Sequence, residues 1–258
     1  MCLIVLAVGM RPDLPLIMAA NRDEFHARAS DPLGEWLDRP GVVGGRDREK
    51  GGSWLALHRT GRFAAVTNVR DPARRHPSPR SRGALVSEFL CGTTSAAEAA
   101  DKVVAAGGAY DGFNLLLCDG RSLWYVTNRD HSPRQLGPGI HGLSNHRLGT
   151  PWPKVCRAQD ALRAALDLPK PRLEAALLAL LADETPVEDT QLPQTGVGLE
   201  LERLLSTAFI RAPHYGTRAS TLLLWGAAGD ACLVERRFGP GGMPLGDTRM
   251  ELQFTAPA

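Results

Sequence analysis

The chain has 258 residues, of which 43% are hydrophobic and 22% are charged, and its formal net charge is +2 at pH 7. This composition is typical of a globular protein with a sizeable core, and the nearly neutral charge argues against nucleic acid or an anionic membrane as the main partner. The five cysteines are scattered and form no Cys-x-x-Cys pair. The sequence therefore indicates neither a disulfide framework nor a zinc site, and it favours a reducing, cytoplasmic compartment.

Apolar runs separated by turn residues mark the expected elements. Residues 2–9 and 15–20 are almost continuously apolar and are expected to pair as a hairpin of buried strands. Residues 26–50 are rich in Pro and Gly and are expected to be a loop, and the Arg-rich stretch 70–82 is expected to be a solvated basic loop. Further hairpins are predicted at 51–57 with 62–68, 113–118 with 123–127 and 222–225 with 232–235, helices at 83–91, 95–106, 153–167, 171–182 and 199–206, and an edge strand at 250–254.

This order of hairpins and helices predicts the fold class. Strands that pair as hairpins make antiparallel sheets, and the helices must cover the outer faces of those sheets. We therefore expect an α+β protein, a four-layer αββα sandwich with mainly antiparallel sheets, in a single domain over residues 1–258. No apolar segment approaches the ~20 residues of a membrane-spanning helix, so no membrane span is expected.

The second residue, Cys2, is a candidate catalytic group. A Met followed by Cys is a usual substrate for removal of the initiator Met, which would make Cys2 the N-terminal residue. Cys2 would then carry a thiol nucleophile and an α-amine with a pKa of about 8, so one residue could supply both nucleophile and base. The alternative is that Cys2 is a small buried hydrophobic residue that opens a core strand.

Other polar residues follow predicted strands or turns and complete a set suited to amide chemistry. Arg22 or Arg218 could stabilise a thiolate, and Asp23 could orient the amine or an arginine. Asn68 and Asn145 could donate hydrogen bonds to an oxyanion. Taken singly, the two asparagines also fit turn positions, and Arg22 could form a structural ion pair with Asp23 or Glu24.

Metal and nucleotide chemistry are less well supported. The Gly pairs at 44–45 and 51–52 match no phosphate-binding motif, and His141 and His146 are poorly spaced for a metal without nearby carboxylates. We predict no metal site. Any one of His26, His58, His76 and His214, or a cysteine, remains open as an axial haem ligand.

The motifs, taken together and in order, resemble one family. They are Met1-Cys2, Ala20-Asn21-Arg22-Asp23-Glu24-Phe25, Gly51-Gly52-Ser53-Trp54-Leu55, Thr67-Asn68, Gly112-Phe113-Asn114-Leu115-Leu116, Gly142-Leu143-Ser144-Asn145, Thr150-Pro151-Trp152-Pro153-Lys154 and Tyr215-Gly216-Thr217-Arg218. This set closely resembles the transport and Golgi organisation 2 family, also called the NRDE family, and it covers nearly the whole chain.

The resemblance implies an Ntn-hydrolase-like fold. More distantly, the pattern is similar to the penicillin acylase and bile-salt hydrolase group, in which an N-terminal Cys is the nucleophile. Mapped by motif, the catalytic set of that group corresponds to Cys2, Arg22, Asp23, Asn68, Asn145 and Arg218. This chain departs from the acylases in the order of the polar residues after the second strand, where Arg22 and Asp23 lie.

The family itself is associated with haem trafficking and, less directly, with lipid or acyl-CoA metabolism, and this leads to two main hypotheses. The first is a carrier that requires no cofactor and holds haem or another small amphipathic ligand. Its ligand-binding residues would be Asn21, Arg22, Glu24, Trp54 and Arg218, and the 70–82 loop could also meet ligand carboxylates. The second is a Cys2-nucleophile hydrolase of an amide or thioester bond. A third, simpler interpretation is that the tetrapeptide at 21–24 locks the fold through buried ion pairs.

Overall fold

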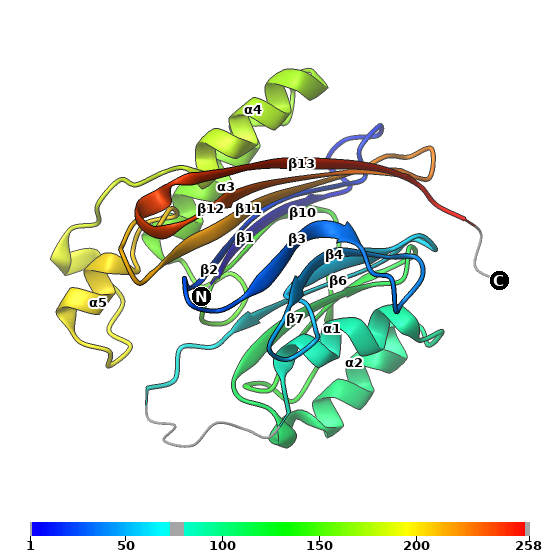
Figure 1. Ribbon diagram of the computed structural model, residues 1–258, viewed down its shortest axis with the longest axis horizontal. Helices are drawn as coiled ribbons and strands as arrows, with labels where there is room; N and C mark the ends of the chain where they lie inside the picture. Colours follow the sequence, from blue (N-terminus) through cyan, green and yellow to red (C-terminus); the bar gives the residue numbers. More distant parts are fainter. Residues whose placement is uncertain (1, 73–79, 256–258) are drawn as a thin grey trace.

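The computed structural model describes residues 2–72 and 80–255, in which two β-sheets are stacked and helices lie outside them (Figure 1). The six-stranded sheet contains, in spatial order, β10 Gly139–Leu143, β1 Cys2–Val8, β2 Leu16–Phe25, β11 Tyr215–Trp225, β12 Asp230–Phe238 and β13 Pro244–Gln253. The seven-stranded sheet contains β3 Ser30–Glu35, β4 Val42–Asp47, β5 Leu55–His58, β6 Arg62–Asn68, β7 Phe113–Cys118, β8 Leu123–Thr127 and β9 Arg134–Gln135. The α-helices are α1 Arg82–Cys91, α2 Ala96–Ala105, α3 Pro153–Ala165, α4 Lys170–Leu181 and α5 Leu199–Leu204.

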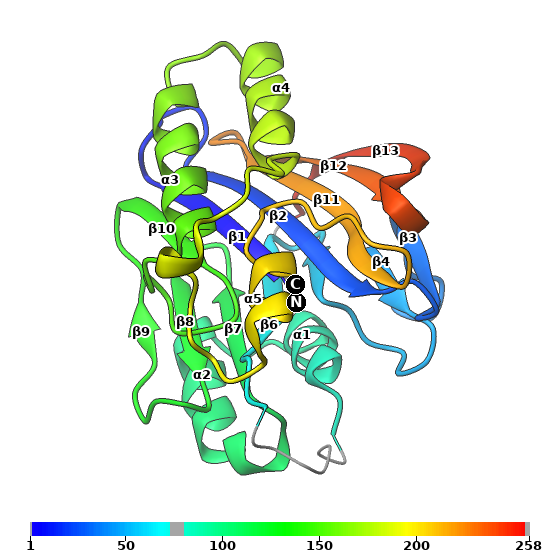
Figure 2. The ribbon, with the colours of Figure 1, turned by 90° about the vertical axis from the view of Figure 1, so that its left-hand side faces the viewer.

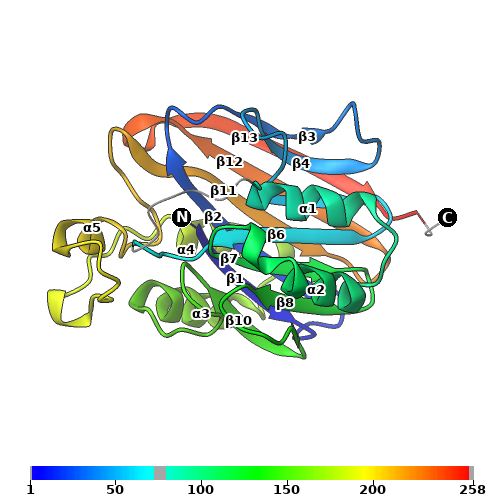
Figure 3. The ribbon, with the colours of Figure 1, turned by 90° about the horizontal axis from the view of Figure 1, so that it is seen from below.

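The helices and sheets form four layers. Helices α3 and α4 cover the outer face of the six-stranded sheet, and α1 and α2 cover the outer face of the seven-stranded sheet (Figures 2 and 3). Within the described residues, every pairing between neighbouring strands of the two sheets is antiparallel. The predicted αββα sandwich is thus confirmed. No helix in the described part of the chain is long and apolar enough to cross a membrane.

Alternating side chains of β1 divide between two cores. Ile4 and Leu6 pack between the sheets, whereas Leu3 and Val5 pack under α3 and α4. Successive residues of a strand point to opposite faces, which explains why this strand is apolar throughout. The same alternation places the side chain of Cys2 on the face that looks toward the other sheet.

The prediction of a loop over residues 26–50 is wrong, because this segment contains β3 and β4. Gly44 in this segment allows close packing between strands and does not mark a turn. A Cβ atom on Gly44 would lie 2.6 Å from the Cβ of Ala56 in β5, and the carbonyl of Gly44 accepts a hydrogen bond of 3.1 Å from the indole of Trp36. Glycine therefore permits the strands to approach here, as it does where another backbone comes close.

Four strands are longer than predicted, and this changes where polar residues lie. The tetrapeptide at 21–24 does not follow β2 but forms part of it, and Arg218 lies within β11 rather than before it. Strand β12 continues to Phe238, and β13, confirmed at the edge of its sheet, begins at Pro244. Hydrophobicity could not reveal these extensions because charged residues line a cavity there.

The basic stretch 70–82 is only partly described, since residues 73–79 lie outside the described residues. At its start, Arg70 is not solvated as predicted. Its side chain is buried and forms an ion pair with Glu202 of α5, and its guanidinium lies 4.8 Å from the ring centroid of Trp152. Arg70 therefore attaches the segment after β6 to α5.

A substitution at Gly52 tests how closely α1 packs against the segment before β5. A Cβ atom on Gly52 would lie 2.4 Å from the carbonyl carbon of Gly83, in the first turn of α1. We expect Gly52→Ala to lower the free energy of unfolding by about 2 kcal/mol, because backbone must move to relieve this overlap. Gly108→Ala, at a site with open space, is the control and should change it by less than about 0.5 kcal/mol. Equal effects of the two substitutions in urea denaturation would contradict this assignment.

Candidate active site

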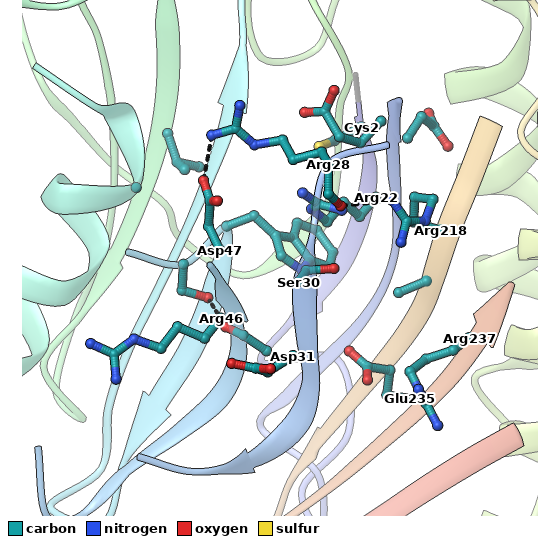
Figure 4. Close-up of a pocket in the computed structure, with 18 of the residues that line it drawn as sticks. Cys2, Arg22, Arg28, Ser30, Asp31, Arg46, Asp47, Arg218, Glu235 and Arg237 are labelled. Atoms are coloured by element: carbon teal, nitrogen blue, oxygen red, sulfur yellow. Dashed lines mark hydrogen bonds and ion pairs between the residues drawn. The ribbon is translucent and has the colours of Figure 1, made fainter. Parts of the chain in front are cut away.

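A cavity of about 260 Å³ lies between the two sheets, at the end of the molecule where β1 begins (Figure 4). Its wall is strongly charged. The charged lining residues are Arg22, Asp23, Glu24, Arg28, Asp31, Arg46, Asp47, Arg82, Arg218, Glu235 and Arg237, and Cys2, Ser53, Trp54, Thr67, Asn68, Ala219, Phe238 and Leu245 are among the others. A concave site with convergent polar groups is typical of ligand-binding and active sites.

Strand register brings Cys2 and Arg22 side by side in this cavity. They are Cα partners in the β1–β2 pair, so their side chains share one face of the sheet. Cys2 is 6% exposed and Arg22 is 9% exposed. The guanidinium of Arg22 forms no hydrogen bond or ion pair with the described residues, and its Nη1 atom is fully buried. A buried cation without a partner is costly, which points to an anionic ligand.

The environment of Cys2 favours the protonated thiol. Burial is the largest effect on its pKa and raises it, while positive charges nearby, that of Arg22 among them, act in the opposite direction. The negative charge of Asp23 acts in the same direction as burial. A reaction at this sulfur therefore needs a base that removes the thiol proton.

Asn145 fixes the orientation of Asn68. The Nδ2 atom of Asn145 donates hydrogen bonds to the Oδ1 of Asn68, at 2.9 Å, and to its backbone oxygen, at 3.1 Å. Ser144 links this pair to β1, because its hydroxyl contacts the carbonyl oxygen of Cys2 at 3.0 Å and the Oδ1 of Asn145 at 3.2 Å. Asn68 lines the cavity, and its Oδ1 is already engaged by Asn145.

A β-bulge in β11 sets the position of Arg218. The pairing of β11 with β2 shifts between Thr217 and Ala219, and Arg218 is the extra residue. Its Nη1 atom donates to the backbone oxygens of Phe25, His26 and Arg28, at 2.9, 3.3 and 3.0 Å, while its Nε is buried without a partner. Arg218 thus holds the turn after β2 and also lines the cavity, as expected of a bulge at a functional site.

Comparison with known proteins identifies the family to which this chain belongs. A profile described as Transport and Golgi organisation 2 matches residues 1–240. The chain belongs to the Transport and Golgi organisation 2 family. A relative named Transport and Golgi organization protein 2 homolog, from Bos taurus, is 36% identical over 260 residues, covering 92% of this chain and 92% of the relative.

Solved structures with the Ntn-hydrolase fold resemble this member of the family. A Caenorhabditis elegans ortholog of N-acylethanolamine-hydrolyzing acid amidase has a TM-score of 0.50 at 10% identity, covering 86% of this chain and 92% of that chain. A C2A mutant of conjugated bile acid hydrolase from Clostridium perfringens has a TM-score of 0.50 at 7% identity, covering 97% of this chain and 92% of that chain. At such low identity the likeness concerns the fold alone, and it confirms the Ntn-hydrolase-like class.

The tetrapeptide that gives the NRDE family its second name divides between the two faces of β2. Arg22 and Glu24 face the cavity, whereas Asn21 packs on the helix side. The amide of Asn21 donates to the backbone oxygens of Leu181 and Ala208 at 2.7 and 2.8 Å, and it is fully buried. Asn21 therefore serves the fold here and is not among the cavity-lining residues, although it was predicted to bind ligand.

The remaining predicted residues differ in their access to the cavity. Trp54 and Asn68 line it, while Asn145 lies behind Asn68 and is fully buried. The ion pair considered for Arg22 with Asp23 or Glu24 is not formed within the described residues. Neighbouring residues on a strand point apart, so Arg22 and Asp23 cannot pair in the way that sequence adjacency suggests.

Asp23, which is also among the cavity-lining residues, belongs to a buried polar cluster that the sequence did not reveal. Its Oδ1 accepts a hydrogen bond of 2.7 Å from the hydroxyl of Thr217, and its backbone oxygen accepts one of 3.1 Å from Tyr215. Burial raises the pKa of Asp23, and the charge of Lys154 partly offsets this. Lys154 is 1% exposed and donates to the carbonyl of Leu205 at 2.8 Å.

One signal could have revealed Lys154. It lies in the first turn of α3, where the helix dipole disfavours a cation, so a lysine there needs another reason to be present. Its proximity to Asp23 supplies that reason, because each charge reduces the cost of burying the other.

Lys154 also gives a pH-dependent prediction. Burial lowers the pKa of its ammonium group to about 8 in the folded protein, against about 10.4 in an unfolded chain. Between these values the unfolded state binds a proton that the folded state has lost, so the free energy of unfolding rises with pH. The rise should amount to about 3 kcal/mol.

Denaturation at several pH values tests this assignment. We expect the rise to be absent in Lys154→Met and retained in Lys102→Met, whose position on α2 is exposed. The difference between variant and wild type is the informative quantity, since other groups titrate in the same range. A Lys154→Met protein with the pH dependence of the wild type would contradict the assignment.

Proposed function

We propose that this protein is a hydrolase of an amide or thioester bond in which Cys2 is the nucleophile. The observation that carries the proposal is the cavity that gathers the thiol of Cys2, the unpaired guanidinium of Arg22 and the amide of Asn68. The fold is shared with proteins whose names describe an acid amidase and a bile acid hydrolase. These names are consistent with the chemistry proposed here.

Removal of Met1 would complete the site, because it frees the α-amine of Cys2. The thiol, whose pKa burial raises, would give its proton to this amine, and the sulfur would attack the carbonyl carbon of the substrate. The C–S bond forms as the carbonyl π electrons move to oxygen. The C–N or C–S bond to the leaving group then breaks, and the ammonium returns the proton to the departing atom. Water hydrolyses the resulting thioester and releases the acid.

The amide of Asn68 is placed to bind the oxyanion of the tetrahedral intermediate. Because Asn145 holds its oxygen, its N–H groups need no reorientation during the reaction. Asn145 acts as a positioning residue in this scheme. Asp23, whose Oδ1 accepts a hydrogen bond from Thr217, would contribute charge to the region of the amine.

A haem or amphipathic-ligand carrier is the second candidate, favoured by the unpaired Arg22, which suits a ligand carboxylate. The cavity supports this candidate less well than it supports the hydrolase. Among the described residues that line it, none is a histidine, so Cys2 would have to be the axial ligand of a haem. The charged walls are also a poor match for an apolar macrocycle.

A comparison of two forms of the untagged protein tests the proposal. One form is treated with methionine aminopeptidase, and the other retains Met1; both are offered acyl p-nitroanilides and acyl thioesters. We expect turnover by the form that begins at Cys2 and none by the form that retains Met1. Equal turnover by the two forms would exclude the α-amine as base, and absence of turnover together with saturable haem binding would favour the carrier.

A further inference from the structure

Strand register forms a row of residues that begins at the nucleophile. Cys2 pairs with Arg22, Arg22 pairs with Ala219, and Ala219 pairs with Arg237, across β1, β2, β11 and β12. Directly paired residues share a face, so all four side chains point toward the other sheet, and all four line the cavity. Neighbouring strands are about 4.8 Å apart, which places Ala219 about 10 Å from Cys2.

The arginines in this row, and Arg218 beside it, form no ion pair with the described residues. Arg22 has no partner among the described residues, and the Nε atoms of Arg218 and Arg237 are buried without a partner. Arg237 donates through Nη2 to the carbonyl of Leu245 at 3.1 Å. Arg22 and Arg218 also repel each other, since Arg22 contributes to the lowered pKa of Arg218 after burial. In Figure 4, Arg22 and Arg218 lie beside Cys2, and Arg237 lies farther along the wall.

The nearby carboxylates do not form ion pairs with these arginines. An oxygen of Glu235 accepts a hydrogen bond of 2.7 Å from the backbone of Leu33, which joins the two sheets, and Glu24 accepts one of 2.9 Å from the backbone of Phe25. Neither forms an ion pair with Arg22, Arg218 or Arg237 in the described residues. By contrast, Arg28, which also lines the cavity, is paired with Asp47. Positive charge is therefore in excess over Ala219.

We propose that the substrate carries an oxyanion, a carboxylate or a phosphate monoester, that binds over Ala219 between Arg22 and Arg237. This inference rests on the proposed function only in taking Cys2 as the reacting group. The small side chain of Ala219 leaves room for the anion, and guanidinium groups bind both kinds of oxyanion with two parallel hydrogen bonds. The scissile carbonyl at Cys2 and the anion are then separated by about two strand spacings, or about 10 Å.

Affinity labelling of Cys2 measures this separation without any need for turnover. Bromoacetyl-6-aminohexanoate places a carboxylate about 10 Å from its reactive carbon, comparable to two strand spacings, whereas bromoacetylglycine has a much shorter spacer and bromoacetamide has no charge. In each case the sulfur of Cys2 displaces bromide, the C–S bond forms, and the thiol proton passes to the buffer. We expect the long reagent to alkylate Cys2 about tenfold faster than the other two, as one charge-assisted hydrogen bond would provide.

Two matched variants locate the anion. Arg237→Gln should remove the advantage of the long reagent. Arg236→Gln should retain it, because Arg236 is on the opposite face of β12 and pairs with Asp247. Bromoacetyl-5-aminopentyl phosphate distinguishes the two oxyanions: a larger advantage than that of the carboxylate identifies a phosphate ligand, and a smaller one identifies a carboxylate.

The outcomes separate this inference from the proposed function. Rates that do not depend on the spacer, or that fall equally in the two variants, would overturn the anion site even if the protein hydrolyses amides. Spacer-dependent labelling without turnover would retain the anion site and remove the hydrolase. If no reagent alkylates Cys2, calorimetry with 6-acetamidohexanoate tests the inference instead. We then expect saturable binding that Arg237→Gln weakens. No saturable binding, or equal binding to the wild type and to Arg237→Gln, would overturn the inference.

Discussion

Cys2→Ala is expected to lower the rate of amide or thioester hydrolysis by about 10⁴-fold, because it removes the atom that forms the acyl-enzyme. The affinity for substrate should change little, since alanine preserves the backbone pairing of β1 with β2. A fall in the rate of product formation, together with substrate binding retained in calorimetry, would assign the sulfur to the chemical step.

Cys118→Ala is the control for this substitution. Cys118 is 8% exposed and packs in the same core between the sheets, but it does not line the cavity. Burial raises the pKa of its thiol to about 11, so it is unreactive at neutral pH. We expect Cys118→Ala to retain the wild-type rate. Turnover that survives in Cys2→Ala and is lost in Cys118→Ala would contradict the assignment of the nucleophile.

Arg22→Met is expected to stabilise the unliganded protein while it abolishes ligand binding. Methionine fills similar space and removes a cation that is nine-tenths buried and has no partner in the described residues. Replacing buried charge by an apolar side chain commonly contributes about 1–4 kcal/mol. A gain of about 2 kcal/mol corresponds to a rise in Tm of about 4–8 °C for a chain of this size. Stability and function would then change in opposite directions, as expected of a binding residue.

Arg62→Met provides the matched control, because Arg62 is 8% exposed but fully engaged. Its guanidinium donates to the backbone oxygens of Phe89 and Thr94 and lies 4.0 Å from the ring centroid of Phe89. We expect this substitution to lower the free energy of unfolding by about 2–3 kcal/mol, since it leaves buried carbonyls without donors. If differential scanning calorimetry finds that both substitutions lower Tm, Arg22 has a structural partner and the anionic ligand is not required.

The architecture could be predicted from the sequence because the main signals are local. The continuous apolar run of β1, the capping box of α2 at Ser95 and the turns between hairpins specify buried strands, helix starts and antiparallel pairing. The segment 26–50 could not be predicted in the same way. Taken alone, Gly44 indicates a turn. Its role in allowing the close approach of β5 depends on the packing of the folded sheet.

The candidate site could be predicted as a set of residues but not as an arrangement. The motifs identified Cys2, Arg22 and Asn68, all of which line the cavity. They did not reveal that Asn21 packs on the helix side of β2, or that Thr217 donates a hydrogen bond to the carboxylate of Asp23, because both depend on β2 continuing through the tetrapeptide. Arg237 was missed for a related reason: the strand was expected to end before it, so its position in a row with Cys2 depends on pairings between strands far apart in the sequence.

The most direct test of the central claim is the intact mass of the untagged chain, measured under denaturing conditions before and after brief exposure to an acyl thioester. We expect a chain that lacks Met1 and gains one acyl group, and peptide mapping should place that group on the sulfur of Cys2. A chain that retains Met1 and gains no acyl group would contradict the hydrolase and leave the ligand carrier to be tested with haem.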